Sequence, residues 1–177
     1  MLRKFYPKAY ISSLAQIGPD YFLQKGIKGV ILDLDNTIIP WRSGVMEPYM
    51  SELLNTYLEA GLKLCVVSNA LSNRVERLLK PIGIPGIARA VKPRRKAFME
   101  ALQILGTADS ETAVVGDQIF TDILGGNRLG LYTVLVVPIS KREFLGTRLV
   151  RIIEKTMINR LSKRGVVEIP DYDKKNL

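Results

Sequence analysis

The sequence predicts an α/β fold in which helices cover both faces of a mainly parallel, five-stranded sheet. Short runs rich in Val, Ile and Leu alternate with amphipathic segments along most of the 177 residues, and such continuous apolar runs are typical of strands buried on both faces. A hydrophobic fraction of 47% beside 24% charged residues is ordinary globular composition, which excludes wholesale disorder. No apolar run approaches the ~20 residues that cross a bilayer, so we expect no integral membrane span.

Five apolar runs, each followed by a polar or turn residue, are the predicted strands. They are Gly29 to Asp35, Leu62 to Ser68, Ile87 to Val91, Thr112 to Asp117 and Leu131 to Val137. Four segments with apolar residues at helical spacing fit between them as helices: Pro48 to Ala60, Ser72 to Leu79, Arg95 to Leu105 and Phe120 to Leu129. Gly125 and Gly126 cost about 1 kcal/mol each within the fourth helix, and we expect them to permit close backbone packing.

The chain is short for two domains, and we expect one domain over residues 1–177 with two appendages. Residues 1–28 are predicted to form an N-terminal arm, and residues at about 141–164 a basic amphipathic helix. The first ten residues lack the apolar core and the cleavage site of a secretory signal, so we expect a cytoplasmic protein.

The residue types that the chain lacks exclude several kinds of active site. The chain has no histidine and a single cysteine, Cys65, which excludes Ser-His-Asp triads, Cys-His pairs, His-containing zinc sites and an internal disulfide. Catalysis must then use carboxylates, lysine and hydroxyls, and hard oxygen ligands favour Mg²⁺ over zinc. The net charge of +9 indicates an anionic partner, whether phosphate-bearing lipid, nucleic acid or an acidic protein.

The stretch DLDNT places two carboxylates two residues apart at the end of the first predicted strand. Side chains at i and i+2 of a strand point to the same side, so Asp33 and Asp35 should face one shared space. At about 5 Å and an effective dielectric near 20, two such charges repel by roughly 3 kcal/mol. A bound cation would offset this repulsion.

Three further motifs follow the ends of other predicted strands: Ser68-Asn69, Lys92-Pro93 and GDQIFTD at residues 116–122. In an open parallel sheet the strand carboxyl ends meet at the crevice where ligands bind, so the four motifs should lie together. The motif DxDxT followed by GDxxxTD is a specific sequence signature, far stronger than any single glycine motif. With these motifs the chain resembles the haloacid dehalogenase (HAD) superfamily of phosphatases, over roughly Val30 to Val137.

The resemblance implies a Rossmann-like three-layer αβα sandwich, Mg²⁺ and an aspartyl-phosphate intermediate. It implies that Asp33 is the nucleophile, that Asp35 is the general acid and base, and that Lys92 neutralises the nucleophile and phosphoryl oxygens. The implied substrate-binding residues are Thr37, Ser68 and Asn69, and the implied metal ligands are Asp33, the backbone carbonyl of Asp35, Asp117 and Asp122. Asn36 stands where many family members have glycine, and asparagine tolerates the same left-handed conformation.

Physical chemistry supports these roles. Phosphate monoesters hydrolyse extremely slowly without a catalyst, largely because an anionic nucleophile must approach an anionic phosphoryl group. Mg²⁺ on one side and Lys92 on the other would cancel that repulsion, and attack by Asp33 would divide the reaction into two easier steps. Asp35 could protonate the leaving oxygen and later deprotonate water, provided that its pKa is raised enough to hold a proton. Arg94 and Arg95 either meet a second phosphate of the substrate or form the exposed face of the third helix.

Family members often carry a cap domain after the first or second motif, but here about 30 residues separate Thr37 from Ser68 and about 22 separate Asn69 from Lys92. We therefore expect no cap domain, and an open site suits a phosphate on a membrane, a nucleic acid or a protein. The PKAY arm, DLDNTIIPW, AxKPRRKAF and GDQIFTDILGGN resemble subfamily III phosphatases of the YqeG group, which is related to phosphatidylglycerophosphate phosphatases. That resemblance implies removal of the terminal phosphate from phosphatidylglycerophosphate at a membrane surface.

The C-terminal segment leaves two interpretations open. An apolar stripe at helical spacing consists of Phe144, Leu145, Leu149, Ile152, Ile153, Met157 and Leu161. Basic residues lie mostly on its other faces: Arg148, Arg151, Lys155 and Arg160. The stripe fits an interfacial helix on anionic lipid, giving peripheral association with the inner face of the membrane, or a helix that covers the sheet.

Two alternative functions would use the same site. A phosphatase for nucleic-acid ends or phosphoproteins would bind polyanions in a salt-sensitive way and would not respond to lipid micelles. A non-catalytic phosphate-binding module is less favoured, because it would have no need for Asp35.

Overall fold

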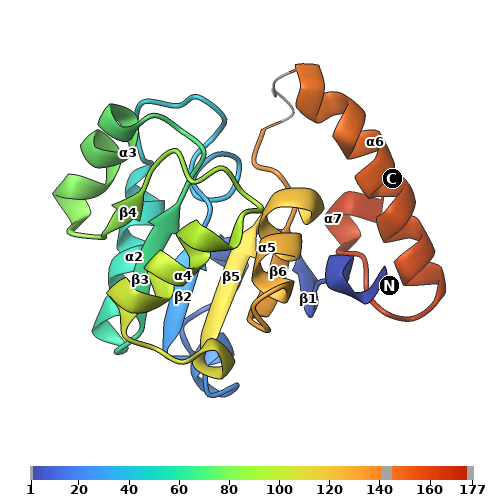
Figure 1. Cartoon of the computed structure of the whole chain (residues 1–177), viewed down its shortest axis with the longest axis horizontal. Coiled ribbons are helices and arrows are strands. Elements are labelled where there is room, and N and C mark those ends of the chain that lie inside the picture. The colour runs from blue at the N-terminus through green and yellow to red at the C-terminus, as the bar shows by residue number, and fades with distance from the viewer. Residues whose placement is uncertain (1, 141–144, 175–177) are drawn as a thin grey trace.

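A computed structural model describes residues 2–140 and 145–174 of the chain (Figure 1). Six parallel strands form one sheet in the order β1-β6-β5-β2-β3-β4. The strands are β1 (Ala9–Ile11), β2 (Gly29–Leu32), β3 (Lys63–Val67), β4 (Gly86–Ile87), β5 (Thr112–Gly116) and β6 (Tyr132–Val136). Because every pair of neighbouring strands is parallel, the carboxyl ends of all six strands lie at the same end of the sheet. The predicted α/β fold with a parallel sheet is confirmed.

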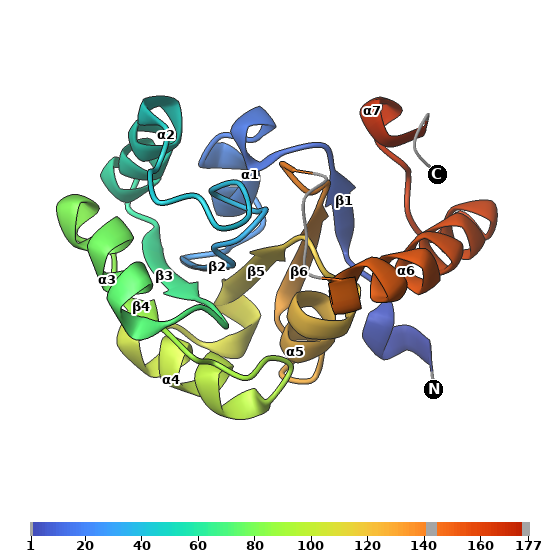
Figure 2. The ribbon, with the colours of Figure 1, turned by 90° about the horizontal axis from the view of Figure 1, so that it is seen from above.

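Helices cover both faces of the sheet, as Figure 2 shows from above. On one face lie α1 (Asp20–Leu23), α2 (Pro48–Glu59) and α3 (Ser72–Leu79), and on the other lie α4 (Arg95–Leu105) and α5 (Leu124–Asn127). Near the β1 edge lie α6 (Leu145–Lys163) and α7 (Asp171–Lys174). The remaining elements are four 3₁₀ turns, η1 (Leu2–Phe5), η2 (Leu14–Gln16), η3 (Lys80–Ile82) and η4 (Asp109–Glu111), and a π-helical turn, η5 (Ile119–Ile123).

Alternation along β2 explains why the sheet needs both helical layers. Val30 and Leu32 point to the same face and pack in one cluster with Leu54 of α2. Ile31 points the other way and belongs to a second cluster with Phe98 of α4. Each fully buried side chain of this size contributes about 1.5–3 kcal/mol relative to exposure. The continuous apolar run read from the sequence is thus a strand with two buried faces.

The sheet has six strands and not the predicted five, because the edge strand β1 was not predicted. Residues 9–11 pair in parallel with β6 at the register Ala9 to Val134, although the segment was expected only as an arm. Its three half-buried residues, Ala-Tyr-Ile, form an apolar run too short to indicate a strand. At the opposite edge, β4 ends at Ile87 instead of Val91, and Arg89 and Val91 have positive φ angles of 49° and 52°, which end the extended backbone.

The segment after β5 differs from the predicted helix at Phe120 to Leu129. It begins as the π-helical turn η5 and continues as the short α5. The expected close packing of its glycines is confirmed, because a Cβ on Gly125 would stand 2.3 Å from Phe98 Cε2 and one on Gly126 would stand 2.7 Å from Thr133 Cγ2. Any larger residue at these positions would push α5 away from the sheet and from α4.

The connections around the site are short. Between β2 and β3 the chain forms one loop and α2, and between β3 and β4 it forms α3 and η3. Both segments are described throughout, and neither contains a separate folding unit, in agreement with the expectation of no cap. None of the described helices is both long enough and apolar enough to span a membrane.

The apolar stripe predicted for the C-terminal helix is divided between two sides of α6. Leu161 and Ile158 are buried, and Ile158 packs with Ile119 of η5 and Leu135 of β6. Ile152 is 63% exposed and its neighbour Ile153 is 57% exposed. Phe144 lies outside the described residues, as do the side chains of Leu145, Arg148 and Leu149.

Cys65 lies in the middle of β3 and is fully buried, as its apolar strand predicted. Burial raises the pKa of its thiol to about 12, because the thiolate would have no water around it. We expect the native protein to react with a thiol reagent at pH 8 only as slowly as it unfolds, and the unfolded protein to react at once. A fast reaction in native buffer would show that β3 is open to solvent.

Candidate active site

The turn after β2 sets the positions of the two carboxylates. The Asp33 amide donates to Val115 O at 2.9 Å and so continues the ladder one residue beyond the strand. Asn36 then adopts φ 64°, the left-handed conformation expected for this position. The amide oxygen of its side chain accepts a bond from the Trp41 amide at 3.1 Å, which closes the turn. Asp33 is left almost buried and Asp35 partly exposed.

Lys92 connects the first and last motifs inside the protein. Its ammonium group lies 2.5 Å from Asp33 Oδ1 and 2.7 Å from Asp122 Oδ1, and all three side chains are buried. The Thr37 hydroxyl donates to Asp33 Oδ2 at 3.2 Å. The Lys92 amide donates to Asn69 Oδ1 at 2.9 Å, which fixes the loop that carries the lysine. Residues far apart in the sequence thus meet around Asp33, as the convergence of strand ends predicts.

Burial and neighbouring charges set the protonation of this cluster. Burial raises the pKa of Asp33 to about 6, although Lys92 opposes the shift. Burial alone would lower the pKa of Lys92, but Asp122 and Asp33 together raise it above its usual value. Lys92 therefore stays charged at neutral pH, and Asp33 is mainly ionised there. An ionised Asp33 held against a cation can act as a nucleophile.

Three carboxylates form a group that fits a divalent cation. Oxygens of Asp33, Asp117 and Asp122 lie within 4.8 Å of one another, and all three residues are buried. Asp117 Oδ1 is buried and accepts no hydrogen bond from any described residue, so it remains available to an ion. A Cβ at residue 116 would stand 2.3 Å from Asp122 Cγ, so Gly116 is what lets Asp122 approach. Hard oxygen donors of this kind are the ligands that Mg²⁺ prefers.

Arg151 and Glu154 reach the site from α6, although neither was predicted from the sequence to be a site residue. Arg151 donates to the carboxylate and to the backbone carbonyl of Asp117, and to Glu154 Oε2 at 3.1 Å. Glu154 Oε1 accepts bonds from the amides of Ile119 at 2.6 Å and Phe120 at 3.2 Å, and so caps η5, which carries Asp122. Burial raises the pKa of Asp117 well above its usual range despite the nearby guanidinium of Arg151. Nothing in the sequence indicated which face of the helix turns inward.

An open cavity of about 530 Å³ lies above Asp33. Its lining consists of Asp33, Asp35, Trp41, Arg42, Ser68, Asn69, Ala70, Leu71, Arg74, Lys92, Gln118 and Thr121. Arg74 of α3, also missed in the sequence, donates to both oxygens of Asp35 at 2.7 and 2.8 Å and to the Ser43 carbonyl at 3.0 Å. The Arg42 amide donates to Asp35 Oδ1 at 3.0 Å. Trp41 and Arg42 thus belong to the cavity and not to an unrelated surface.

Of the five residues predicted to bind substrate, two line the cavity and three do not. Ser68 and Asn69 line the cavity, whereas Thr37 is buried beside Asp33 and is not among the lining residues. Arg94 and Arg95 are exposed at the start of α4 and are also absent from the lining. Substrate binding by these five residues stays a prediction.

We expect Mg²⁺ to stabilise the protein through the three carboxylates. At 100 times its dissociation constant the ion should raise the unfolding temperature by about 5–10 °C. Asp117→Asn should lose most of this increment, whereas Asp109→Asn, an exposed acidic residue in η4, should keep it. Differential scanning fluorimetry with and without chelator measures the increment directly. An unchanged increment in Asp117→Asn would mean that the ion binds elsewhere.

Comparisons with known proteins agree with this geometry. Residues 90–138 match the HAD-hydrolase-like family. Over 169 residues the chain is 36% identical to the probable phosphatase YqeG of Bacillus subtilis, a match that covers 95% of this chain and 98% of that protein. It is 30% identical to phosphatidylglycerophosphate phosphatase 1 of Arabidopsis thaliana, over 90% of this chain but 49% of that protein. A cobalt-bound deoxy-D-mannose-octulosonate 8-phosphate phosphatase of Haemophilus influenzae has a similar fold, with a TM-score of 0.52 at 16% identity, over 63% of this chain and 69% of that one.

Proposed function

This chain belongs to the YqeG group of haloacid dehalogenase-like phosphatases, and from that premise we propose that it is a Mg²⁺-dependent phosphomonoesterase that acts through a phosphoryl group on Asp33. The observation that carries the proposal is the position of Asp33, at the floor of an open cavity and 2.5 Å from the Lys92 ammonium. Two further buried carboxylates, Asp117 and Asp122, lie beside it.

In the first step an oxygen of Asp33 attacks phosphorus, and the bond from phosphorus to the alcohol oxygen breaks. Asp35 gives its proton to that oxygen, and Lys92 balances charge on Asp33 and on the phosphoryl oxygens. In the second step water attacks phosphorus, Asp35 takes the proton of that water, and the bond to Asp33 breaks to release phosphate. Mg²⁺ held by Asp33, Asp117, Asp122 and the Asp35 carbonyl would supply positive charge against the phosphoryl oxygens.

We propose phosphatidylglycerophosphate as the substrate. The relative from Arabidopsis carries this activity in its name and matches most of the present chain. The cavity is open, as a phosphate presented on a large surface requires, and the net charge of +9 suits anionic lipid. Nucleic-acid ends and phosphoproteins fit the open cavity and the charge as well, so the substrate test must include them.

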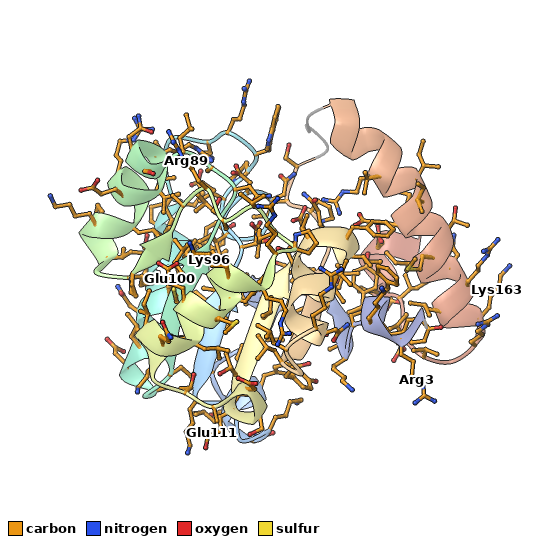
Figure 3. All side chains as sticks on the ribbon, in the orientation of Figure 1. Arg3, Arg89, Lys96, Glu100, Glu111 and Lys163 are labelled. Carbon is orange, nitrogen blue, oxygen red and sulfur yellow. The ribbon has the colours of Figure 1, made fainter. Side chains whose placement is uncertain are left out.

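We propose that the protein is cytoplasmic and associates with the inner face of the membrane. The outer side of α6 is the surface that we propose to contact the bilayer. A groove of about 290 Å³ there is lined by Tyr6, Ile152, Ile153, Thr156, Met157, Arg160, Leu161 and Arg164. Exposed isoleucines and arginines in one groove match the apolar and anionic layers of a lipid surface. Figure 3 shows Arg3 and Lys163 extending into solvent at the same end of the molecule, which adds positive charge there.

A substrate panel tests the proposed reaction. With Mg²⁺, kcat/KM for phosphatidylglycerophosphate in mixed micelles should exceed by about 10-fold or more the values for a phosphopeptide, a 5′-phosphorylated oligonucleotide and a sugar phosphate. Equal or slower turnover of the lipid would overturn the lipid assignment. A higher kcat/KM for the oligonucleotide or for the phosphopeptide than for the lipid would identify that class of compound as the substrate.

A vesicle experiment tests the docking surface. Ile152→Ser with Ile153→Ser should lower partitioning onto vesicles of phosphatidylglycerol and phosphatidylcholine about 10-fold, because each exposed isoleucine loses its transfer into the interface. The matched control is Met99→Ser with Ile104→Ser, two half-exposed residues on α4. Sedimentation of the protein with vesicles measures the partitioning. Equal losses in both double variants would contradict the assignment of α6.

A further inference from the structure

The inner side of α6 carries a buried pair of opposite charges. Arg151, Glu154, Ile158 and Leu161 follow one another at intervals of three and four residues, so they share one side of the helix. Ile158 packs against Ile119 of η5, and the Arg151 side chain is only 14% exposed. Burying a charged pair costs hydration free energy that apolar residues would not lose. This pair therefore calls for a function besides the attachment of the helix.

Arg151 fixes one oxygen of Asp117 and leaves the other oxygen without a partner. Its guanidinium donates to Oδ2 and to the backbone carbonyl of Asp117, which holds the carboxylate in one orientation. Asp117 Oδ1 accepts no hydrogen bond from any described residue. Each oxygen of Asp33 and of Asp122, in contrast, accepts at least one. Asp117 Oδ1 is therefore the oxygen of the cluster that most requires a cation.

Glu154 holds the turn that carries Asp122. Its Oε1 accepts bonds from the amides of the first two residues of η5, at 2.6 and 3.2 Å. These amides need an outside acceptor, because the first N–H groups of a helical turn have no partner within it. Glu154 Oε2 accepts from Arg151 at 3.1 Å. The pair thus connects the end of β5 to the start of η5, and so fixes Asp117 relative to Asp122.

We propose that Arg151 and Glu154 are positioning residues for the divalent cation, because they hold Asp117 and Asp122 in the arrangement that binds it. The inference rests on the proposed function, since the cation is the one that the phosphatase reaction would use. Removing a group that orients a metal ligand from behind commonly weakens metal binding about 10- to 100-fold. Helix α6 is then part of the active site, although it lies outside the four sequence motifs.

An effect of charge alone would differ from an effect of position. Arg151 and Glu154 carry opposite charges 3.1 Å apart, so together they add almost no net charge to the site. Removing only the arginine makes the site more negative, which favours a cation, and removing only the glutamate does the opposite. Charge therefore predicts changes of opposite sign in the two single variants, whereas positioning predicts weaker binding in both.

The test is a calorimetric titration of Mg²⁺ into the full-length protein without substrate. The dissociation constant should rise about 10- to 100-fold in Arg151→Gln and in Glu154→Leu. Arg151→Lys keeps the charge but offers one ammonium in place of a fork of donors, so it should recover only part of the affinity. Glu154→Gln keeps an oxygen for the amides of η5 and should lose less affinity than Glu154→Leu.

The matched controls remove one exposed charge of each sign nearby. Lys155→Gln on α6 and Glu168→Gln in the segment after it should leave the dissociation constant unchanged. Slow reaction of the Cys65 thiol verifies that each variant is folded, and Arg151→Lys supplies the comparison if Arg151→Gln does not fold.

Kinetics on a soluble aryl phosphate gives a second measurement in which lipid binding plays no part. In Arg151→Gln the Mg²⁺ concentration for half-maximal activity should rise by the same factor as the dissociation constant. At saturating Mg²⁺ the KM for the ester should change less than about 3-fold, because the substrate does not contact α6. A general loss of structure would instead lower activity at every Mg²⁺ concentration.

Two results would overturn the inference. Tighter binding of Mg²⁺ in Arg151→Gln would leave only an effect of charge, and unchanged binding in folded Arg151→Gln and Glu154→Leu would leave only a structural role. Failure of the proposed function looks different. If the wild type binds Mg²⁺ with this dependence on Arg151 but hydrolyses no phosphomonoester, the reaction falls and the positioning role remains.

Discussion

Asp33→Asn is expected to lower kcat on a generic aryl phosphate by at least about 10⁴-fold, as removal of an attacking side chain does in other covalent enzymes. The amide has nearly the same shape as the carboxylate, so the cavity should keep its form. It has no charge with which to attack phosphorus, and it no longer offers Lys92 an anion at 2.5 Å. Steady-state kinetics with excess Mg²⁺ gives the size of the loss.

The matched control is Asp20→Asn, an exposed aspartate at the start of α1. It should keep full activity, and both variants should protect the Cys65 thiol as the wild type does. Turnover of Asp33→Asn within 10-fold of the wild type would remove Asp33 from the role of nucleophile. Turnover of the wild type in excess chelator would equally remove the metal from the mechanism.

Lys92→Gln should reduce kcat/KM by about 10²- to 10³-fold, the usual cost of losing one preorganised charge at a reacting phosphoryl group. It should also lower the free energy of unfolding by about 3–5 kcal/mol at pH 8, because Asp33 and Asp122 are left buried without their cation. Urea denaturation of the metal-free protein measures this second effect.

The stability loss in Lys92→Gln should depend on pH in a definite direction. Lys92 lowers the pKa of Asp33, which burial raises to about 6, so removing the lysine moves that pKa further up. An acid with a raised pKa binds more protons when folded than when unfolded, so the variant gains stability as the pH falls. The deficit should be largest at pH 8 and smaller at pH 5. Lys96→Gln, on α4 and labelled in Figure 3, is the exposed control and should show neither effect.

Most of the fold could be read from the sequence because buried parallel strands leave long apolar runs. β2, β3, β5 and β6 lie within the predicted segments, and α2, α3 and α4 begin at the predicted residues. The edge strands could not be read in the same way. β1 contributes only three half-buried residues, and β4 consists of the exposed Gly86 and the buried Ile87, so only the first residue of the strand predicted at 87–91 is in a strand. The pairing of both strands depends on neighbours that are distant in the sequence. The π-helical start of the segment at residue 119 likewise follows from its cap by Glu154, a contact across 35 residues.

The core of the site was predictable for a related reason. Asp33 and Asp117 directly follow β2 and β5, while Lys92 and Asp122 lie in the segments just after β4 and β5. The carboxyl ends of parallel strands converge whatever the helices do. Arg74 and Arg151 come instead from the sides of helices, where rotation decides which residue faces inward. A sequence pattern gives that rotation only where the apolar stripe is unambiguous. The stripe on α6 is divided, and Arg151 turns inward while Ile152 and Ile153 remain exposed.

The most direct measurement of the central claim is the identity of the residue that carries the phosphoryl group during turnover. The wild type is mixed with substrate and Mg²⁺, quenched within milliseconds, and treated with borohydride, which reduces an acyl phosphate to an alcohol. Peptide mass spectrometry should then find homoserine at position 33, and none in samples without substrate. Unmodified Asp33 under conditions of rapid turnover, or modification at another carboxylate, would contradict the account.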